Sequence, residues 1–209
     1  MEHTANQIVL RGYLDQLPRF SHENHGKRFY GFSLEVPRLS GAVDLLPVIA
    51  RDTVLNQMDL SGGEMIALRG QVRSFRNPEP SGQRLRIYAF AEELRTEDGE
   101  PCNEVTLCGM IGARPVFRRT PLGREICDVM LVTPRSYGRA DRLPCIFWGR
   151  TGTEIAQGEV GDQVTLTGRL QSRGYKKMTE NGVEERTAYE ISALTAELQK
   201  PQQQVEDRT

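Results

Sequence analysis

The sequence predicts an all-β protein made of two similar small barrels in tandem. Three observations carry this prediction. The chain repeats itself after an offset of 97 positions, its apolar residues alternate with a period of two, and each copy has room for only one short helix. With 209 residues, the chain is long enough for two domains of roughly 100 residues each.

The repeat keeps one register over a long stretch. The matched pairs include Asn6 with Asn103, Leu10 with Leu107, Gly12 with Gly109, Pro37 with Pro134 and Asp44 with Asp141, and one residue of slippage then places Gly70 on Gly168. Chance similarity does not hold one register over about 40 positions, so two homologous domains are expected. We predict a first domain at 1–95, a polar linker at 96–102, a second domain at 103–198 and a disordered polar tail at 199–209.

The apolar spacing in each copy predicts three strands, then a short helix, then two further strands. The clearest alternating runs are QIVLRGYL, FYGFSLEV and MIALRGQV in the first copy, and EVTLCGMI, ICDVMLVT, LPCIFW and QVTLTGRLQS in the second. The segments 53–60 and 151–160 break the alternation and are expected to be the helices, each followed by a glycine stop signal, Gly63 or Gly161.

This order of elements is typical of the OB-fold, a five-stranded Greek-key barrel that binds oligonucleotides or oligosaccharides. The fold class is therefore two tandem OB-folds, each with a short helix between strands 3 and 4. Glycines lie inside the strands, where a barrel needs tight bends: Gly12, Gly70, Gly109 and Gly168. The alternative is another small β-barrel with one helix.

The sequence shows no catalytic or metal-binding pattern, so no enzyme, cofactor or metal site is expected. The four cysteines, Cys102, Cys108, Cys127 and Cys145, form no CxxC pair of the kind that zinc sites use. They are expected to be reduced thiols, which fits the cytoplasm. His22 and His25 flank SHENHG, which we interpret as a solvated turn. No apolar run has the ~20 residues of a membrane span, and no signal peptide is evident.

The second copy resembles the bacterial single-stranded DNA-binding protein (SSB) family. The resemblance is carried by NEVTLCGMIGARPVFRRTPLGRE, then PCIFWGRTGTEIAQ, then GDQVTLTGRLQSRGY, three blocks in the family's order. The first copy matches the same template only weakly, through GEMIALRGQVRSF. Chains with two such folds are a known variant of the family.

The resemblance implies sequence-independent binding of single-stranded DNA by aromatic stacking and by cations that follow the phosphates. Carried over by position, the stacking aromatics are Tyr137, Trp148 and Tyr175, and Phe117 is a further candidate. Strand alternation agrees in part, because it places Leu143, Cys145 and Phe147 inward and Trp148 outward, beside Arg142 and Ile146. Each aromatic also has a packing interpretation, in the barrel or at an interface.

Cations surround these aromatics. The candidates for phosphate contacts are Arg118, Arg119, Arg135, Arg142, Arg150, Arg173, Lys176 and Lys177. The chain as a whole is nearly neutral, with 27 basic and 28 acidic side chains, and 23 of the 27 cations are arginine, which can both pair with phosphate and stack on bases. We therefore expect a local cationic groove on an otherwise acidic surface.

The first copy departs from the pattern. Its positions that match Tyr137, Trp148 and Tyr175 are Ser40, Arg51 and about Asn77, so all three stacking aromatics are replaced. Weaker contacts are expected there from Arg38, Arg51, Arg73, Phe75 and Arg76. The first domain is then expected to add backbone contacts or to form a subunit interface.

The predicted function is binding and protection of single-stranded DNA in replication, recombination or repair. The alternative is a PriB-type primosomal protein that acts mainly through protein partners, and a third interpretation is an OB enzyme or a tRNA- or sugar-binding domain. A homodimer would bring four OB-folds together, the number that one-fold members of the family reach as tetramers. The end QQQVEDRT lacks the acidic tip with a terminal aromatic by which the family recruits repair enzymes, which puts that recruitment in doubt.

Overall fold

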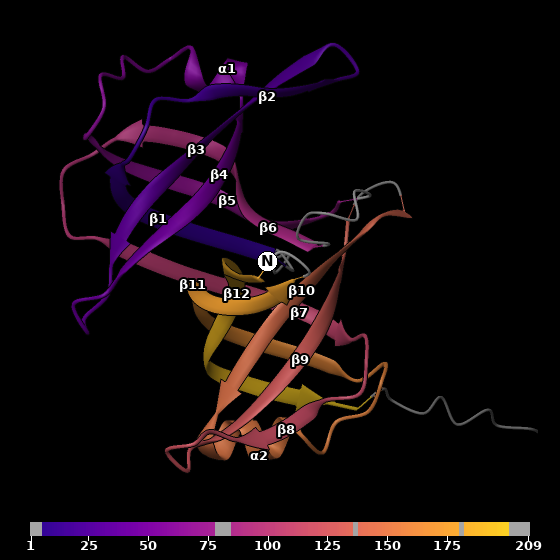
Figure 1. Cartoon of the computed structure of the whole chain (residues 1–209). Coiled ribbons are helices and arrows are strands. Elements are labelled where there is room, and N and C mark those ends of the chain that lie inside the picture. Colours follow the sequence, from indigo (N-terminus) through magenta and orange to yellow (C-terminus); the bar gives the residue numbers. More distant parts are fainter. Residues whose placement is uncertain (1–5, 78–84, 136–137, 180–181, 201–209) are drawn as a thin grey trace, which may run out of the picture.

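The chain folds into two barrels joined by one continuous sheet (Figure 1). The computed structural model describes residues 6–77, 85–135, 138–179 and 182–200. The first repeat contains β1 (Asn6–Leu14), β2 (Arg19–Asn24), β3 (Lys27–Pro37), β4 (Val43–Arg51), α1 (Asp52–Leu55), β5 (Met65–Arg76) and β6 (Leu85–Thr96). The second contains β7 (Cys102–Ile111), β8 (Val116–Arg119), β9 (Glu125–Pro134), β10 (Ala140–Trp148), α2 (Gly149–Ile155), β11 (Gln163–Thr179) and β12 (Gly182–Gln199).

The all-β class and the single short helix in each repeat are confirmed. Both helices are shorter than the segments predicted for them. The strands β2 and β8 were not predicted; each pairs with the strand that follows it, β3 or β9. His22 lies in β2 rather than in a loop, and the turn is made by His25 and Gly26, whose φ angles are 49° and 70°.

The strand order is nearly symmetric about the joint between the repeats. It runs β2-β3-β4-β6-β5-β1-β7-β11-β12-β10-β9-β8, and β3–β1 and β7–β9 pairings close the two barrels. β1 and β7 pair antiparallel, with Ile8 opposite Val105, its own counterpart in the repeat. A local two-fold axis therefore passes between these residues, and Figure 1 shows α1 and α2 at opposite ends of the molecule.

The core follows the predicted alternation. Leu143, Cys145 and Phe147 of β10 are buried, whereas Trp148 at its end is 37% exposed, which confirms their predicted sides. The prediction was wrong for Ile146, which is only 3% exposed, because β10 pairs with β12 at this point and that face of the strand is covered. The glycine predictions also hold, because at Gly70 and Gly168 a Cβ atom would overlap the carbonyl oxygen of the neighbouring strand. The register shifts at both points, which marks a β-bulge.

Two matching ion-pair clusters fasten the repeats together, and we call them the twin clamp. In one, the buried Asp44 accepts hydrogen bonds from Arg38 Nε at 2.6 Å and from Ser172 N at 2.6 Å, and Arg38 Nη2 donates to the Ser172 carbonyl at 2.8 Å. Arg38 and Asp44 belong to the first repeat, and Ser172 belongs to the second.

The other half of the twin clamp reverses these roles. The buried Asp141 of the second repeat accepts from Arg135 Nε at 2.5 Å, and from Ser74 N at 2.6 Å and Arg73 Nη1 at 3.0 Å of the first repeat. Arg135 Nη2 donates to the Ser74 carbonyl at 3.0 Å. The clamp therefore fixes how the two barrels face each other.

None of the described helices is long and apolar enough to cross a membrane.

Candidate nucleic-acid interface

The second repeat carries an open groove of about 710 Å³, which we call the main groove. It lies over β10, β11 and β12, and its lining combines one tryptophan, aliphatic and polar side chains, the acidic Glu190 and arginines. The arginines are Arg38, Arg118, Arg124, Arg169 and Arg173. Arg38 comes from the first repeat, so the two repeats build the main groove together.

Trp148 forms part of the wall of the main groove. Its indole Nε1–H donates a hydrogen bond to Ser192 Oγ at 3.2 Å, which holds the ring against β12. Ile146, two residues earlier in β10, is buried beneath the groove. The indole thus has a fixed orientation and remains 37% exposed, and a side chain held in this way can receive a stacked base.

The cations of the main groove are positioned by carboxylates. Arg118 Nε donates to Asp128 at 2.5 Å, and Arg173 Nε lies 3.4 Å from Glu190 Oε2. Both arginine side chains keep about half of their surface exposed, at 47% and 52%. The Arg118–Asp128 pair is half-exposed on both sides and stabilises little, so the Arg118 guanidinium can turn to a phosphate at small cost. Glu190 is buried and also accepts a hydrogen bond from Gln171 Nε2 at 3.0 Å, which it keeps when Arg173 turns away.

Sequence reasoning did not single out Arg124, Arg169 or Ser192. Arg169 directly follows the bulge glycine Gly168 in the block that resembles the family, and its Nε is buried without a hydrogen-bond partner among the described residues. Ser192 has no sequence signal, because its role depends on β12 lying beside β10.

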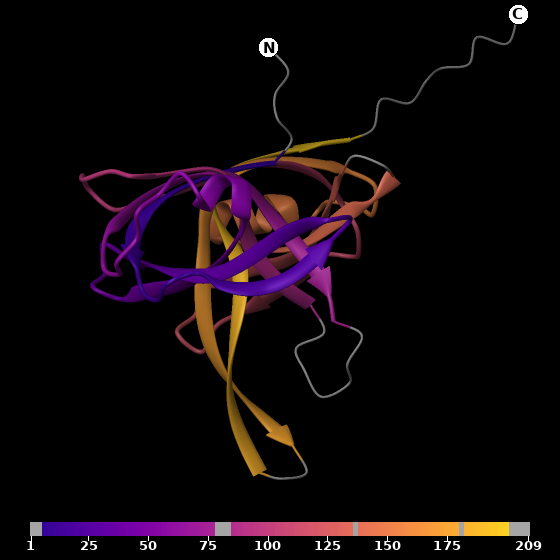
Figure 2. The same cartoon turned by 90° about the horizontal axis from the view of Figure 1, so that it is seen from above.

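The hairpin of β11 and β12 extends away from the body of the protein (Figure 2). It carries Tyr175, half-buried, with the Arg173 guanidinium 6.0 Å from the ring centroid and Arg186 opposite it on β12. Lys176 and Lys177 follow on the same arm and are exposed. The predicted pairing of an aromatic with cations is therefore present in the hairpin next to the main groove.

The other predicted residues of the second repeat are more scattered. Phe117 on β8 is 44% exposed, Arg119 pairs with Glu125 at 2.7 Å, and Arg150 of α2 pairs with Glu154 at 2.8 Å. Arg142 is exposed on β10. Tyr137 lies outside the described residues.

Arg135 is held in the twin clamp with its side chain only 21% exposed, so a phosphate would have to displace Asp141 to reach it. In the first repeat, Arg38 and Arg73 are also clamp members, with side chains 21% and 20% exposed. Arg51 lies 6.0 Å from the ring centroid of Phe90, and Phe75 and Arg76 are exposed on β5. Arg38, Arg73 and Arg135 are therefore held in the twin clamp, whereas the other predicted phosphate contacts that form ion pairs do so nearer the surface.

The first repeat is richer in surface aromatics than the position-by-position comparison indicated. His22 stacks on Phe29 at 4.7 Å between ring centroids, and Phe29 lies 6.3 Å from Phe90. These aromatics occupy β2, β3 and β6 rather than the three positions that the resemblance pointed to. They could have been noticed as FYGF and IYAF in the sequence.

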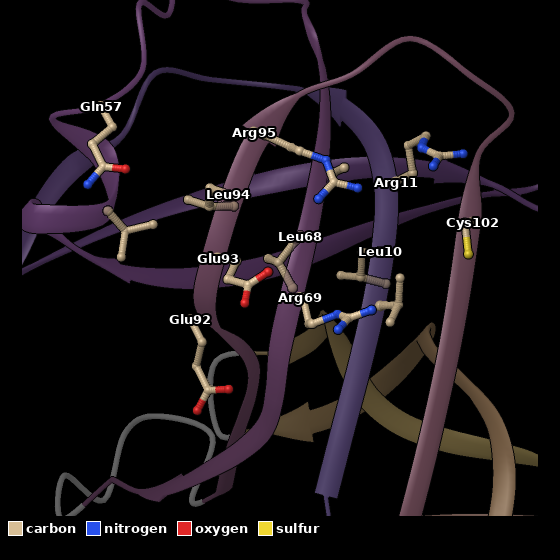
Figure 3. A pocket seen from close by; sticks show the side chains of 13 residues that line it. Leu10, Arg11, Gln57, Leu68, Arg69, Glu92, Glu93, Leu94, Arg95 and Cys102 are labelled. Atoms are coloured by element: carbon tan, nitrogen blue, oxygen red, sulfur yellow. The ribbon is translucent and has the colours of Figure 1, made fainter. Parts of the chain in front are cut away.

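A further pocket of about 400 Å³ lies in the first repeat around β1, β5 and β6 (Figure 3). Figure 3 shows Arg69 and Arg95 near Glu93, and Arg11 on the neighbouring strand. Its lining contains no aromatic side chain and carries both signs of charge, so it lacks the chemistry of a base-stacking site.

The cysteines behave as packing residues. Burial raises the pKa of the Cys127 thiol to about 11 and also raises that of Cys145. Among the described residues, no group of three or more His, Cys, Asp or Glu side chains is placed to hold a metal ion.

Comparison with known proteins points to one family. Residues 102–199 match the model of the single-strand binding protein family. The fold resembles the wild-type single-stranded DNA binding protein from Thermus aquaticus, with a TM-score of 0.77, 19% identity and coverage of 94% of this chain and 93% of that chain. A deletion variant of the same protein gives 0.77 and 19%, over 97% and 98% of the two chains.

The N-terminal domain of PriB from Thermoanaerobacter tencongensis is 32% identical over 45% of this chain and 98% of that one, with a TM-score of only 0.39. No curated protein sequence matches the chain. The two tandem OB-folds predicted from the sequence are confirmed, and the second repeat is similar to the single-strand binding protein family, whose model it matches.

Proposed function

We propose that this protein binds single-stranded DNA without regard to sequence and protects it during replication, recombination or repair. The main groove carries the proposal, because it combines an oriented, exposed Trp148 with four arginines outside the twin clamp, Arg118, Arg124, Arg169 and Arg173, in one open channel. Stacking on an aromatic ring tolerates every base, and arginine contacts the phosphates that every strand carries. No step of this function requires catalysis.

The hairpin of β11 and β12 is proposed to extend the main groove. A strand leaving Trp148 along β11 meets Arg173 and then Tyr175, Lys176 and Lys177. Each stacked base contributes about 1–3 kcal/mol, so Trp148 and Tyr175 together would supply much of the affinity. Phe117, Arg119, Arg142 and Arg150 are proposed to contact the strand nearer its ends.

Two further features belong to this proposal. The functional units are the domains 1–95 and 103–198, joined by 96–102, and two chains are proposed to associate as a homodimer with four OB-folds. Light scattering at micromolar concentration is expected to give twice the chain mass; a stable monomer of 23.6 kDa would contradict the dimer.

Titration with oligo-dT tests the function directly. Trp148 is the only tryptophan, so quenching of its emission reports occupation of the main groove. Binding is expected to weaken as salt rises, because phosphate contacts release counterions. Unchanged emission together with no gel shift at low salt would refute the proposal.

A variant pair makes the same test specific for stacking. Trp148→Ala is expected to weaken dT binding by about 5- to 150-fold in a fluorescence-anisotropy assay with labelled DNA, the loss of one stacked base. Trp148→Phe keeps an aromatic face and is expected to retain most of the affinity. Equal affinity of all three proteins would show that Trp148 does not stack.

A further inference from the structure

The first repeat carries a pocket of about 630 Å³ that the main groove does not include, and we call it the junction pocket. Its lining is mainly apolar and aromatic: Pro47, Ile49, Phe75, Ile87, Tyr88 and, from the second repeat, Tyr189. Phe75 is 54% exposed and therefore presents its ring to solvent at the pocket.

The junction pocket occupies the place in the first repeat that an ion pair occupies in the second. Counting from the bulge glycines, Phe75 is five residues after Gly70, as Arg173 is five after Gly168. Tyr88 is three residues before Ala91, which is opposite Gly70, as Glu190 is three before Ala193, which is opposite Gly168. The Arg173–Glu190 pair is thus replaced by two aromatic rings, so the first repeat has a different, aromatic version of this surface.

The two aromatic walls of the pocket lie beside charged groups of the opposite repeat. Tyr88 lies near Arg135 and Asp141 of the twin clamp, and burial raises the pKa of its hydroxyl. Tyr189 is half-buried beside the other half of the clamp, and burial, with Asp44 nearby, raises the pKa of its hydroxyl. Both rings are half-buried, so they have less freedom to lose when a ligand stacks on them.

The junction pocket and the main groove meet at one strand. Tyr189 lines the pocket and Glu190 lines the groove, and successive side chains of a strand point to opposite faces. The base of the β11–β12 hairpin therefore separates the two cavities by the thickness of a two-stranded ribbon. A ligand long enough to leave the groove can pass this base and enter the pocket.

We propose that the junction pocket is a second base-binding site, which takes nucleobases of the same DNA strand that occupies the main groove. This inference rests on the proposed function. Aromatic faces suit bases of any identity, and Arg86, exposed in the lining of the pocket, supplies a cation for the phosphates. The first repeat thus stacks bases with Phe75 and Tyr88 instead of the three aromatics that it lacks.

Oligonucleotide length separates the two sites. The wild type and Phe75→Ala are titrated with an 8-mer of dT, about the size of one OB-fold site, and with a 35-mer, which exceeds two such sites. Phe75→Ala is expected to bind the 8-mer like the wild type, with equal Trp148 quenching, and to bind the 35-mer about 5- to 150-fold more weakly. Tyr13→Ala, which removes an aromatic of similar exposure (43%) outside the pocket, is the matched control and should leave both affinities unchanged.

A direct reporter removes the dependence on affinity. In a Trp148→Phe background, Phe75→Trp places the only tryptophan in the junction pocket, and its emission is expected to change with the 35-mer and not with the 8-mer. The inference would be overturned if the emission of this tryptophan did not change with the 35-mer, or if Phe75→Ala bound the 35-mer as tightly as the wild type. Either result would leave the proposed function intact. A wild type that binds neither oligomer would instead refute the proposed function.

Two other results would also overturn the inference. Equal weakening of Phe75→Ala toward both lengths would mean general damage to the fold. A change in its mass by light scattering, without a length-dependent loss, would show that the junction pocket is an interface between copies of this chain.

Discussion

Removing one carboxylate of the twin clamp should loosen the joint between the repeats. In Asp141→Ala, the guanidinium groups of Arg135 and Arg73 and the Ser74 N–H lose their shared acceptor in a place where Asp141 itself is fully buried. Breaking a buried ion pair from one side costs about 3–5 kcal/mol. Because both arginines keep about a fifth of their side-chain surface in water, we expect the lower end, about 3 kcal/mol.

Thermal and urea unfolding followed by circular dichroism measure this loss. For a chain of this size, about 3 kcal/mol corresponds to a fall in Tm of roughly 6–12 °C. Asp141→Asn, which keeps the size and one acceptor oxygen, should fall between Asp141→Ala and the wild type. The control is Asp128→Ala, which breaks a half-exposed pair with Arg118 and should cost below about 1 kcal/mol. If Asp141→Ala melts no earlier than Asp128→Ala, the clamp does not hold the repeats together.

Three further outcomes follow from the geometry. Burial alone would raise the pKa of Asp141, but its hydrogen bonds from Arg135, from the Ser74 N–H and from Arg73 outweigh burial and leave the pKa below its usual value. The stability that Asp141 contributes is therefore complete above about pH 4, its pKa in the unfolded chain, and is lost as the pH falls further. Urea unfolding from pH 7 to 3 should show this loss, and Asp141→Asn should show it more weakly. Gly168→Ala would push a methyl group into the Ser192 carbonyl and should destabilise the fold by about 1–3 kcal/mol, whereas Gly174→Ala, with nothing within 4 Å, should not; equal melting temperatures would disprove the close approach. Native protein at pH 8 should react with a thiol reagent at Cys108 well before Cys127, as peptide mapping of the labelled protein can show, and the reverse order would contradict the burial of Cys127.

Much of the fold was predictable from sequence because the signals are local. Alternation over LPCIFW placed Phe147 inward and Trp148 outward, and the bulge glycines Gly70 and Gly168 stand inside otherwise regular strands. The repeat itself required only that positions be compared at one offset. The strands β2 and β8 were missed, because they are exposed throughout and so show no alternation.

The site was less predictable because its partners come from distant parts of the chain. Asp44 and Asp141 were correctly seen as equivalent positions, but their hydrogen bonds to the other repeat depend on how the barrels face each other. The aromatics of the junction pocket were undervalued because each position of the first copy was compared only with the aromatic positions of the second. Phe75 aligns with Arg173 and Tyr88 aligns with Glu190. Because a charged pair in one repeat is aromatic in the other, a comparison limited to the aromatic positions of the second repeat does not detect it.

The pairing of β1 with β7 has a consequence for how the two halves can change. In an assembly of identical chains, a substitution at a symmetric joint appears on both sides at once, and both copies must tolerate it. Here Ile8 and Val105 face each other across the joint, and each is encoded by its own codon, so either can change alone. The same holds for the two halves of the clamp. The five residues between β6 and β7 also keep the partner at a high effective concentration, so the joint does not come apart on dilution. One half is thereby free to exchange an ion pair for aromatic rings while the other keeps its arginines.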